Sequence, residues 1–595
     1  MLFKILPLLL GAQAVACATE PVAEVSSAVA TASDADLDCL SEPTAIIKAV
    51  FQEAVRHSPT LAVSAGDRSL DASLDDLGPA EFATFYRRMR KLDQKLAGID
   101  AAALSAAGRY ALDLALTTTR DARSRDAART QLWELSSIAD LGDILSSISQ
   151  VQVLRSGSDL DDLLIRYRKI PAAMEQRQAN LRAGLAQGLV ASQPVVARVI
   201  GNYRDNFGAT TGDGSPFADV AFAADISPAT QALWKARVAA VVDGVVSPAL
   251  QRFAGFLETT VLPRARTTFG DAGLGTLGTS YYLAQIKVQT GSDLTPDEIH
   301  ALGLQRVAEI EAQMTAQLEV LGIHEATLAA GLARLKQQPE SVPATAAQAS
   351  AHAAEVLNKL YGAPWSDAVW GMPNPSAMKV TVVERAGTPF YLIGASTMVI
   401  PVGSTTQYEL DSMVTHEYTH YLQDLVHGQP GAEPAVSPYL GLFGSVVLVE
   451  GEAHFSEVLA LGSTLYDYPD ARTAALTKLA GLNGLMLRAV RMVVDTGIHT
   501  KGWTRDQVIA YMADHLVSNP PFFSFEADRY ASWPGQALGY RLGMEAMASE
   551  ESRAAAALGV RLSSSAFHRM ALGLSGATTQ LLHQATDDFI ASTPQ

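Results

Sequence analysis

The stretch His416-Glu417-Tyr418-Thr419-His420 matches the pattern H-E-x-x-H. Positions four apart share one face of a helix with 3.6 residues per turn, so the two imidazoles can bind one zinc ion. The glutamate between them is then placed to act as a general base. With only 12 histidines in the chain, a chance match should be rare. The pentapeptide therefore predicts one zinc ion per chain, with His416 and His420 as ligands and Glu417 as the catalytic base.

A zinc site of this kind needs a third protein ligand and one open position for water, and Glu450 is the best candidate. Seven residues, or two helical turns, separate Glu450 from Glu457, so both face the same side of a second helix. Glu450 would bind zinc, and Glu457 would hold a ligand histidine by a hydrogen bond. Glu452 points away and is a poorer ligand. His454, one turn beyond Glu450, is either a substrate contact or an alternative ligand.

Strand signal is concentrated just before this motif. Residues 378–384, 390–393 and 398–401 are rich in β-branched and apolar side chains and are separated by Gly and Ser turns. This pattern predicts a small antiparallel sheet just before the HExxH helix. Its edge would either hold an extended peptide or belong to a buried structural hairpin, and the sequence leaves both readings open.

The rest of the chain from about residue 46 onward is typical of helices, since Ala, Leu, Arg, Gln and Glu are abundant. One helix start is unusually clear. Thr295 is a suitable N-cap, Pro296 takes the first helical position and Glu298 lies three residues after the cap. Gly322 would end this helix. Its apolar stripe contains Ile299, Leu302, Val307, Ile310, Met314 and Leu318. The predicted fold class is therefore mostly α.

Residues 1–16 are typical of an export signal. Lys4 supplies a positive charge, and the apolar run that follows is well short of the ~20 residues that a membrane span needs. Residues 16–18 (Ala-Cys-Ala) fit cleavage by an ordinary signal peptidase. Residues 14–17 (Ala-Val-Ala-Cys) instead form an imperfect lipobox, which would leave a lipid anchor at Cys17. We therefore expect an exported bacterial protein, either periplasmic or a membrane-anchored lipoprotein.

Composition bounds the remaining organisation. Residues 17–45 are rich in Ala, Ser, Thr, Glu and Asp with little periodicity, which predicts a disordered linker between the signal and a folded body, 46–595. Apolar residues make up 48% of the chain, so that body should fold. The net charge of −17 argues against wholesale binding of nucleic acid or anionic lipid. Cys17 and Cys39 are the only cysteines, so disulfides do not hold this fold.

Two C-terminal stretches, residues 491–504 and 529–540, closely resemble signatures of the bacterial "domain of unknown function 885" family. The capped segment at residues 294–300 and the spaced glutamate pair also match. That family is similar to the mostly helical zinc peptidases typified by thimet oligopeptidase and the Taq-type carboxypeptidases. The resemblance implies two helical lobes, about 46–290 and 291–595, which flank a deep cleft with zinc on its floor.

One feature departs from the family. Its members commonly have a longer motif with Pro-Gly before the second metal-side histidine, whereas this chain has the compact form that ends at His420. The compact motif suits ordinary zinc geometry. It puts in doubt any substrate preference taken from typical members.

The resemblance and side-chain chemistry together assign further roles. Tyr540 would donate to the oxyanion, and His499 would be a second donor or a substrate contact, because Gly497 and Gly502 suggest a turn that opens to a cavity. Asp495 would orient His499 from the second shell or serve as an ordinary cap. Four further side chains could bind the peptide substrate. The guanidinium groups of Arg491, Arg529 and Arg541 could each bind its C-terminal carboxylate through two hydrogen bonds, and Tyr530 is the fourth.

The leading hypothesis is an exported zinc metallopeptidase. Its substrates would be short peptides, because the deep cleft that the resemblance implies excludes folded proteins. Carboxypeptidase and oligopeptidase cleavage both stay open, and the arginines tilt the expectation toward trimming from the C-terminus. Two alternatives have other functions. One is a non-catalytic envelope protein that binds peptides, and the other is a zinc amidase that acts on cell-wall fragments.

Overall fold

The computed structural model describes residues 34–594, except 65, 139, 209–211, 363–364, 373–374, 376, 384–388, 393–395, 404 and 428–442. The predicted export signal, Cys17 and most of the predicted linker lie outside the described residues. Within the linker, however, Asp34–Cys39 form helix α2. Leu37 of this helix is buried and Asp34 pairs with Arg87, so ordered structure begins before the predicted residue 46. Cys39 is exposed and free.

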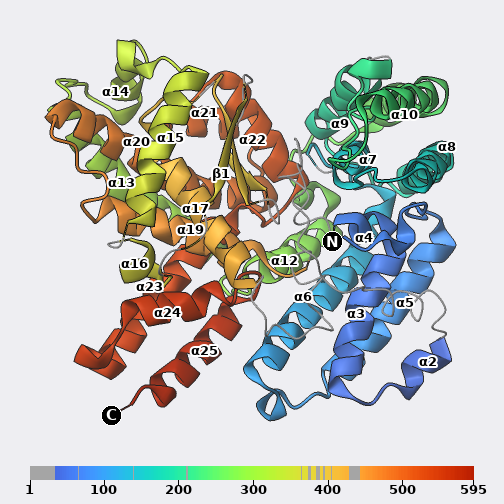
Figure 1. The fold of residues 1–595 in the computed structure, drawn as a ribbon, viewed down its shortest axis with the longest axis horizontal. Coiled ribbons are helices and arrows are strands. Elements are labelled where there is room, and N and C mark those ends of the chain that lie inside the picture. Colours follow the sequence, from blue (N-terminus) through green and yellow to red (C-terminus); the bar gives the residue numbers. More distant parts are fainter. Residues whose placement is uncertain are drawn as a thin grey trace. The chain divides into compact units, whose positions relative to one another are not determined.

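The chain divides into two compact units, with the described residues up to Ala284 in unit 1 and most of those from Gln285 onward in unit 2. Both are built from helices, as predicted (Figure 1). The predicted deep cleft between lobes stays a prediction.

All regular secondary structure in the described residues of unit 1 is helical, and the β-bridges there are isolated. Arg166 is fully buried and donates to the carbonyl oxygens of Leu70 and Ser73, which ties its helix to the loop below it. The α-helices of this part of the chain are α2, α3 (Pro43–His57), α4 (Pro59–Ser64), α5 (Pro79–Leu96), α6 (Ala106–Ala128), α7 (Leu141–Val151), α8 (Gly157–Ala186), α9 (Gln193–Gly201), α10 (Pro228–Val241) and α11 (Ser247–Phe256), and α12 (Thr276–Thr290) leads into unit 2.

Unit 2 carries the remaining helices and the sheet. Its first long helix, α13, starts at the predicted cap, where Thr295 and Glu298 form a reciprocal capping box. Its α-helices are α13 (Pro296–Val320), α14 (Leu328–Leu335), α15 (Ala346–Tyr361), α16 (Ser366–Trp370), α17 (Glu409–His427), α19 (Val446–Leu461), α20 (Ala471–Thr500), α21 (Arg505–His515), α22 (Pro520–Ser532), α23 (Leu538–Leu558), α24 (Ser564–Leu572) and α25 (Thr579–Ser592).

The three predicted strands are present as β1 (Lys379–Val383), β2 (Phe390–Leu392) and β3 (Thr397–Pro401), just before α17. The sheet is mixed, not wholly antiparallel as predicted. Its order is β1-β3-β2, in which β3 runs antiparallel to β2 but parallel to β1. Burial explains the order, because every residue of β3 is buried and takes the centre, whereas β1 is partly exposed and takes an edge.

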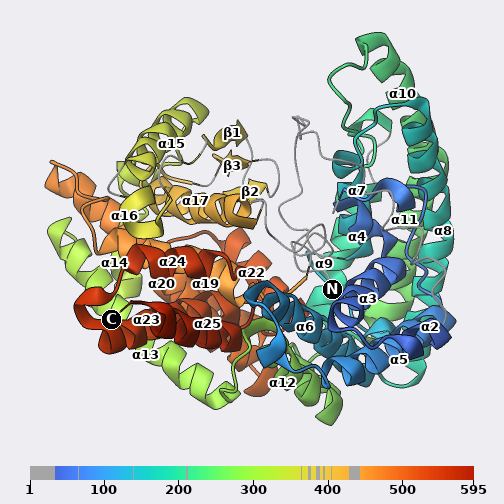
Figure 2. The ribbon, with the colours of Figure 1, turned by 60° about the horizontal axis from the view of Figure 1, so that its bottom comes forward.

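Helix α17 is fixed by an aromatic core on the side away from the motif histidines. Tyr418 and Tyr421 are fully buried there, together with Val414, Tyr391 of β2 and Tyr466. Figure 2 shows the sheet beside α17, and α17 also packs on α19 and α20. The core therefore holds the motif helix on a rigid base.

Three glycines let α19 and α23 pack backbone to backbone. A Cβ atom at Gly543 would lie 1.9 Å from the carbonyl oxygen of Val447, and one at Gly451 would lie 2.5 Å from Gly543 Cα. A Cβ at Gly539 would collide with Val446 at 2.6 Å. Because no side chain fits between the helices, residues near the start of α23 are brought close to Glu450 on α19.

Candidate metal centre

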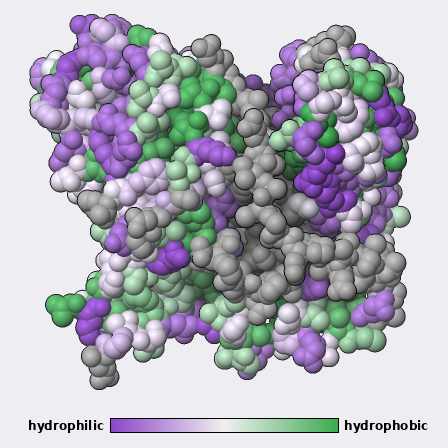
Figure 3. Space-filling view, in the orientation of Figure 1, coloured by the Kyte–Doolittle hydropathy of each residue, from purple (hydrophilic) through white to green (hydrophobic). Residues whose placement is uncertain are grey.

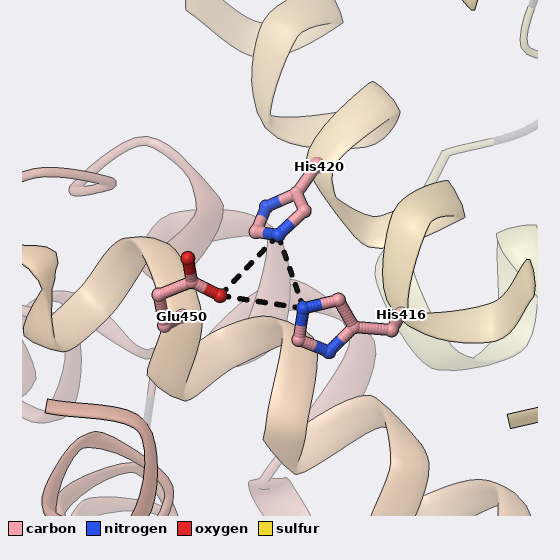
Figure 4. Close-up of side chains that lie close together, drawn as sticks. All are labelled: His416, His420 and Glu450. Atoms are coloured by element: carbon pink, nitrogen blue, oxygen red, sulfur yellow. Dashed lines mark hydrogen bonds and ion pairs between the residues drawn. The ribbon is translucent and has the colours of Figure 1, made fainter. Parts of the chain in front are cut away.

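The structure brings His416 and His420 of α17 together with Glu450 of α19, here called the candidate triad (Figure 4). The two Nε2 atoms are 3.2 Å apart. Glu450 Oε2 lies 3.3 Å from Nε2 of His416 and 3.5 Å from Nε2 of His420. Two imidazole nitrogens and one carboxylate oxygen are a usual zinc ligand set, and a fourth position would remain for water.

The outer nitrogens of both rings show which atoms carry protons. Nδ1 of His416 lies 2.7 Å from Glu457 Oε1, and Nδ1 of His420 lies 2.9 Å from Gln423 Oε1. Both oxygens accept, so each Nδ1 donates, and in the neutral ring each Nε2 keeps a lone pair that can bind a metal ion. Glu450 Oε2, which faces them, is buried and has no hydrogen-bond donor. Three acceptors that face one another in this way suit a cation, so the residues present fit a metal ion.

The electrostatics of the candidate triad also favour positive charge. Burial alone would lower the pKa of His416, but Glu450 and Glu457 outweigh it and raise that pKa to about 9. The two carboxylates therefore favour positive charge at this position, either a second proton on His416 or a metal ion that displaces it.

Glu457 is held as a charged acceptor by several donors, which agrees with its predicted place behind a ligand histidine. Besides His416, it accepts from Arg488 at 3.0 Å and from Ser412 Oγ at 3.0 Å. Gly484 of α20 makes room for it, since a Cβ there would lie 3.0 Å from Glu457 Oε2. Sequence reasoning missed Arg488, and no local pattern marks it, because the contact depends on how α20 packs against α17 and α19.

Sequence reasoning also missed Gln423, which stands behind His420 as Glu457 stands behind His416. The amide nitrogen of Gln423 donates to Glu452 Oε2 at 2.7 Å and to the carbonyl oxygen of Val449 at 2.9 Å. Glu452 is fully buried, and burial raises its pKa well above the ordinary value. Glu452 does not belong to the candidate triad, as predicted from its angle on the helix.

Glu417 has the environment of a proton acceptor. It is buried, and burial raises the pKa of its carboxyl, with His416 and His420 opposing the rise. No hydrogen bond joins this carboxylate to another side chain in the described parts of the protein. Its lone pairs are thus available to a ligand.

Tyr540 lies at the start of α23, half-buried, with its ring beside two guanidinium groups. The centre of the ring is 4.3 Å from Cζ of Arg491 and 5.7 Å from Cζ of Arg488. Burial and the charge of Glu450 raise the pKa of the phenol, so it keeps its proton and can donate a hydrogen bond.

The predicted substrate-binding residues Arg491, Arg529 and Tyr530 belong to one buried group, here called the arginine cluster. Its other members are Glu526 and Gln536. Arg491 donates one hydrogen bond to Glu526 at 3.0 Å, and Arg529 donates two, at 2.9 and 3.0 Å. The Tyr530 hydroxyl also bonds Glu526, and Arg529 reaches Gln536 at 2.6 Å. These side chains are hydrogen-bonded to one another, and two guanidinium groups share one carboxylate.

The other predicted residues lie in different settings. His499 is fully buried inside α20, not at a turn, and its Nε2 lies 3.0 Å from the Tyr530 carbonyl oxygen. His499 lies about 16 Å along α20 from Arg488, the residue of that helix that bonds Glu457 behind the candidate triad. Gly497 lies inside the helix, where its missing side chain admits Trp503. Asp495 accepts from the Gly535 amide at 3.3 Å and so holds the turn between α22 and α23.

Arg541 and His454 both lie outside the candidate triad. Arg541 pairs with Glu545, which also binds Arg306. His454 is fully buried, with Nδ1 3.6 Å from Glu457 Oε1. Burial lowers the pKa of His454 to about 4, so its ring is neutral.

Fold and site define a mostly helical protein whose second unit carries a partly buried His-His-Glu group with the chemistry of a metal centre. The chain belongs to the family of bacterial proteins of unknown function called DUF885, whose profile matches residues 59–585. No curated protein matches the sequence.

Solved structures show the same fold. A predicted lipoprotein from Colwellia psychrerythraea aligns with a TM-score of 0.78 and 21% identity, over 92% of this chain and 99% of that one. A predicted lipoprotein of unknown function from Shewanella oneidensis aligns with a TM-score of 0.67 and 16% identity, over the same shares. Metallocarboxypeptidase 1 of Trypanosoma cruzi aligns at a TM-score of only 0.37 and 12% identity, over 92% of this chain and 96% of that one.

No helix in the described parts of the chain is long and apolar enough to cross a membrane. Hydrophilic and hydrophobic residues are interspersed on the face of each unit that Figure 3 shows.

Proposed function

We propose that this protein is a zinc-dependent peptidase that hydrolyses short peptides. The observation that carries the proposal is the convergence of three ligand atoms, from His416, His420 and Glu450, near the Glu417 carboxylate, which has no hydrogen-bonded side chain among the described residues. A metal site with one carboxylate close by and free of hydrogen bonds is the arrangement that hydrolytic chemistry needs.

Each side chain would have a distinct task. When bound, zinc would act as a Lewis acid and lower the pKa of a water toward about 7. Glu417 would take the proton of the attacking water and return it to the leaving amine. Tyr540, kept protonated by burial and by Glu450, would donate a hydrogen bond to the oxyanion of the tetrahedral intermediate.

Excess positive charge near Tyr540 supports cleavage at the C-terminal end of a peptide. In the arginine cluster two guanidinium groups share the single carboxylate of Glu526. The remaining positive charge would attract a terminal carboxylate in a buried setting, where charges act strongly. Amidation of the peptide's C-terminus tests this part. Undiminished cleavage of the amidated peptide would leave an oligopeptidase and remove the carboxypeptidase version.

The same proposal includes export from the cytoplasm of a bacterium, with either a periplasmic product or a lipid anchor at Cys17. The export pattern at the start of the sequence and the lipoprotein descriptions of two structures of the same fold support it. The partners would be short peptides, without nucleic acid.

Digestion of a broad peptide library, with mass spectrometry of the products and zinc analysis of the purified protein, tests the proposal. We expect one zinc per chain, and cleavage that a chelator stops and added zinc restores. Protein without stoichiometric zinc and without any cleavage would overturn it. Zinc-loaded protein that retains peptides uncut would identify a binding protein instead.

A further inference from the structure

The two histidines of the candidate triad have different outer partners. His416 donates to the carboxylate of Glu457, which accepts in any orientation. His420 donates to the side-chain amide of Gln423, which has an oxygen at one end and a nitrogen of almost the same size at the other. Were that amide reversed, its NH₂ would face Nδ1 of His420. The proton would then move to Nε2, where the ring could no longer bind a cation.

Helix α19 decides which way the amide points. Gln423 Nε2 lies 2.7 Å from Glu452 Oε2 and 2.9 Å from the carbonyl oxygen of Val449. The Val449 carbonyl can only accept, and Glu452 Oε2 accepts beside it, so the NH₂ group faces these two oxygens and the amide oxygen faces His420. Gln423 is 4% exposed and Glu452 is fully buried, so water does not compete for either group.

We propose that Gln423 and Glu452 are positioning residues that set the tautomer of His420. The hydrogen-bonded chain from Glu452 through Gln423 to His420 keeps Nδ1 protonated and leaves Nε2 bare toward the cation. This inference rests on the proposed zinc site. It extends that site to a residue of α19 that touches no ligand of the metal.

An exchange of the two side chains tests the order of donors and acceptors. Gln423→Glu keeps an acceptor for His420 but turns a second carboxylate toward Glu452 and the Val449 carbonyl. The Val449 carbonyl then meets an acceptor where it now has a donor, so the outer contact no longer holds the side chain, and we expect zinc affinity to fall by about 10- to 100-fold. The double variant Q423E/E452Q returns a donor, since the new amide at position 452 can donate to the carboxylate at position 423. It should recover most of the lost affinity.

The measurement is the dissociation constant of the purified protein for Zn²⁺, by competition with a chelating indicator. The visible spectrum of the Co²⁺-loaded protein reports the ligand set separately from activity. Ser456→Ala is the matched control, because it removes the buried bond from Thr419 Oγ1 to Ser456 Oγ, also between α17 and α19, without touching a ligand. We expect its zinc affinity to equal that of the parent.

Failure of this inference differs from failure of the proposed function. If the parent protein binds no zinc, the proposed metal centre is wrong. If the parent binds zinc and Q423E binds it equally tightly, or the double variant no better than Q423E, only the positioning role is wrong. Gln423→Met, which keeps the volume but removes every hydrogen bond of this side chain, decides the matter where the double variant does not fold. Parental affinity in Gln423→Met would overturn the inference.

Discussion

The candidate triad and the arginine cluster are two buried sets of polar side chains in the same unit, and they differ in how their hydrogen-bonding groups are satisfied. In the arginine cluster, donors from Arg491, Arg529 and Tyr530 all meet acceptors, chiefly Glu526. In the candidate triad, Glu450 Oε2 and two imidazole nitrogens, which are acceptors when the rings are neutral, face one another.

Buried polar groups without partners cost free energy, so they persist where a ligand completes them. The comparison therefore distinguishes a set of side chains whose donors and acceptors are already paired from a set that a bound cation would complete. Five predictions test this distinction, from the largest expected effect to the smallest.

Removal of one imidazole should have the largest effect. His416→Ala leaves two ligands, too few to hold zinc at a buried site. We expect zinc content to fall from one per chain to none, and peptide cleavage to fall to background. Zinc analysis and a peptide assay check this, with His300→Ala as the control, since His300 bonds Thr496 elsewhere in the unit. Full activity in His416→Ala would reject the assigned site.

Glu417→Gln should separate binding from turnover. The amide cannot take a proton, yet it does not disturb the candidate triad. We expect zinc binding like that of the parent and a kcat lower by about 10²- to 10⁴-fold. Steady-state kinetics of the zinc-loaded variant measure this. A kcat within a few-fold of the parent would assign the base to another group.

Glu526→Gln should damage stability and spare the metal. It leaves two buried guanidinium groups without their carboxylate, which costs about 3–5 kcal/mol of unfolding free energy. Urea unfolding of the metal-free protein measures the loss. The zinc affinity of the folded variant should match that of the parent. A large change in affinity would mean that the two sets are coupled.

The stability difference between the parent and Glu526→Gln should depend on pH. Burial would raise the pKa of Glu526, but Arg529 and Arg491 outweigh it and lower that pKa to about 2 from an ordinary 4.5. A lowered carboxyl pKa stabilises the fold above pH 4.5 and loses this effect as the pH falls toward 2. The difference should therefore be constant from pH 7 to 5 and shrink below 4.5. A constant difference in acid would show that Glu526 is not ionised.

Glu545→Gln should have the smallest effect. Glu545 also binds two arginines, Arg306 and Arg541, but it is partly exposed to solvent. We expect a loss of roughly 1 kcal/mol or less in the same urea experiment. A loss as large as that of Glu526→Gln would show that the number of arginines, and not burial, determines the cost.

Much of the local structure could be predicted from the sequence. The capping box at Thr295 and the positive φ of 76° at Gly322 are where the residue types place them. Five of the six stripe residues on α13 are buried, and Leu302 is partly buried. The three strands also fall at the predicted positions. All of these depend on residues within one or two turns of each other.

The parts that sequence reasoning missed depend on distant segments. The sheet is mixed because β1 pairs in parallel with β3 across the intervening β2 segment, and no period in the sequence encodes that pairing. His499 was expected at an open turn, but α20 runs through Gly497 because Trp503 packs against that glycine. Arg488 and Gln423 reach their partners only through the packing of α17, α19 and α20.

The sequence by itself determined that His416 and His420 share a helix face and that Glu450 and Glu457 share another, because helical periodicity acts over a few residues. Only the tertiary structure decided that the two faces meet, and which outer groups bind each imidazole. That outcome depends on close packing between helices far apart in the chain, where single glycines such as Gly451, Gly484 and Gly543 set the distances.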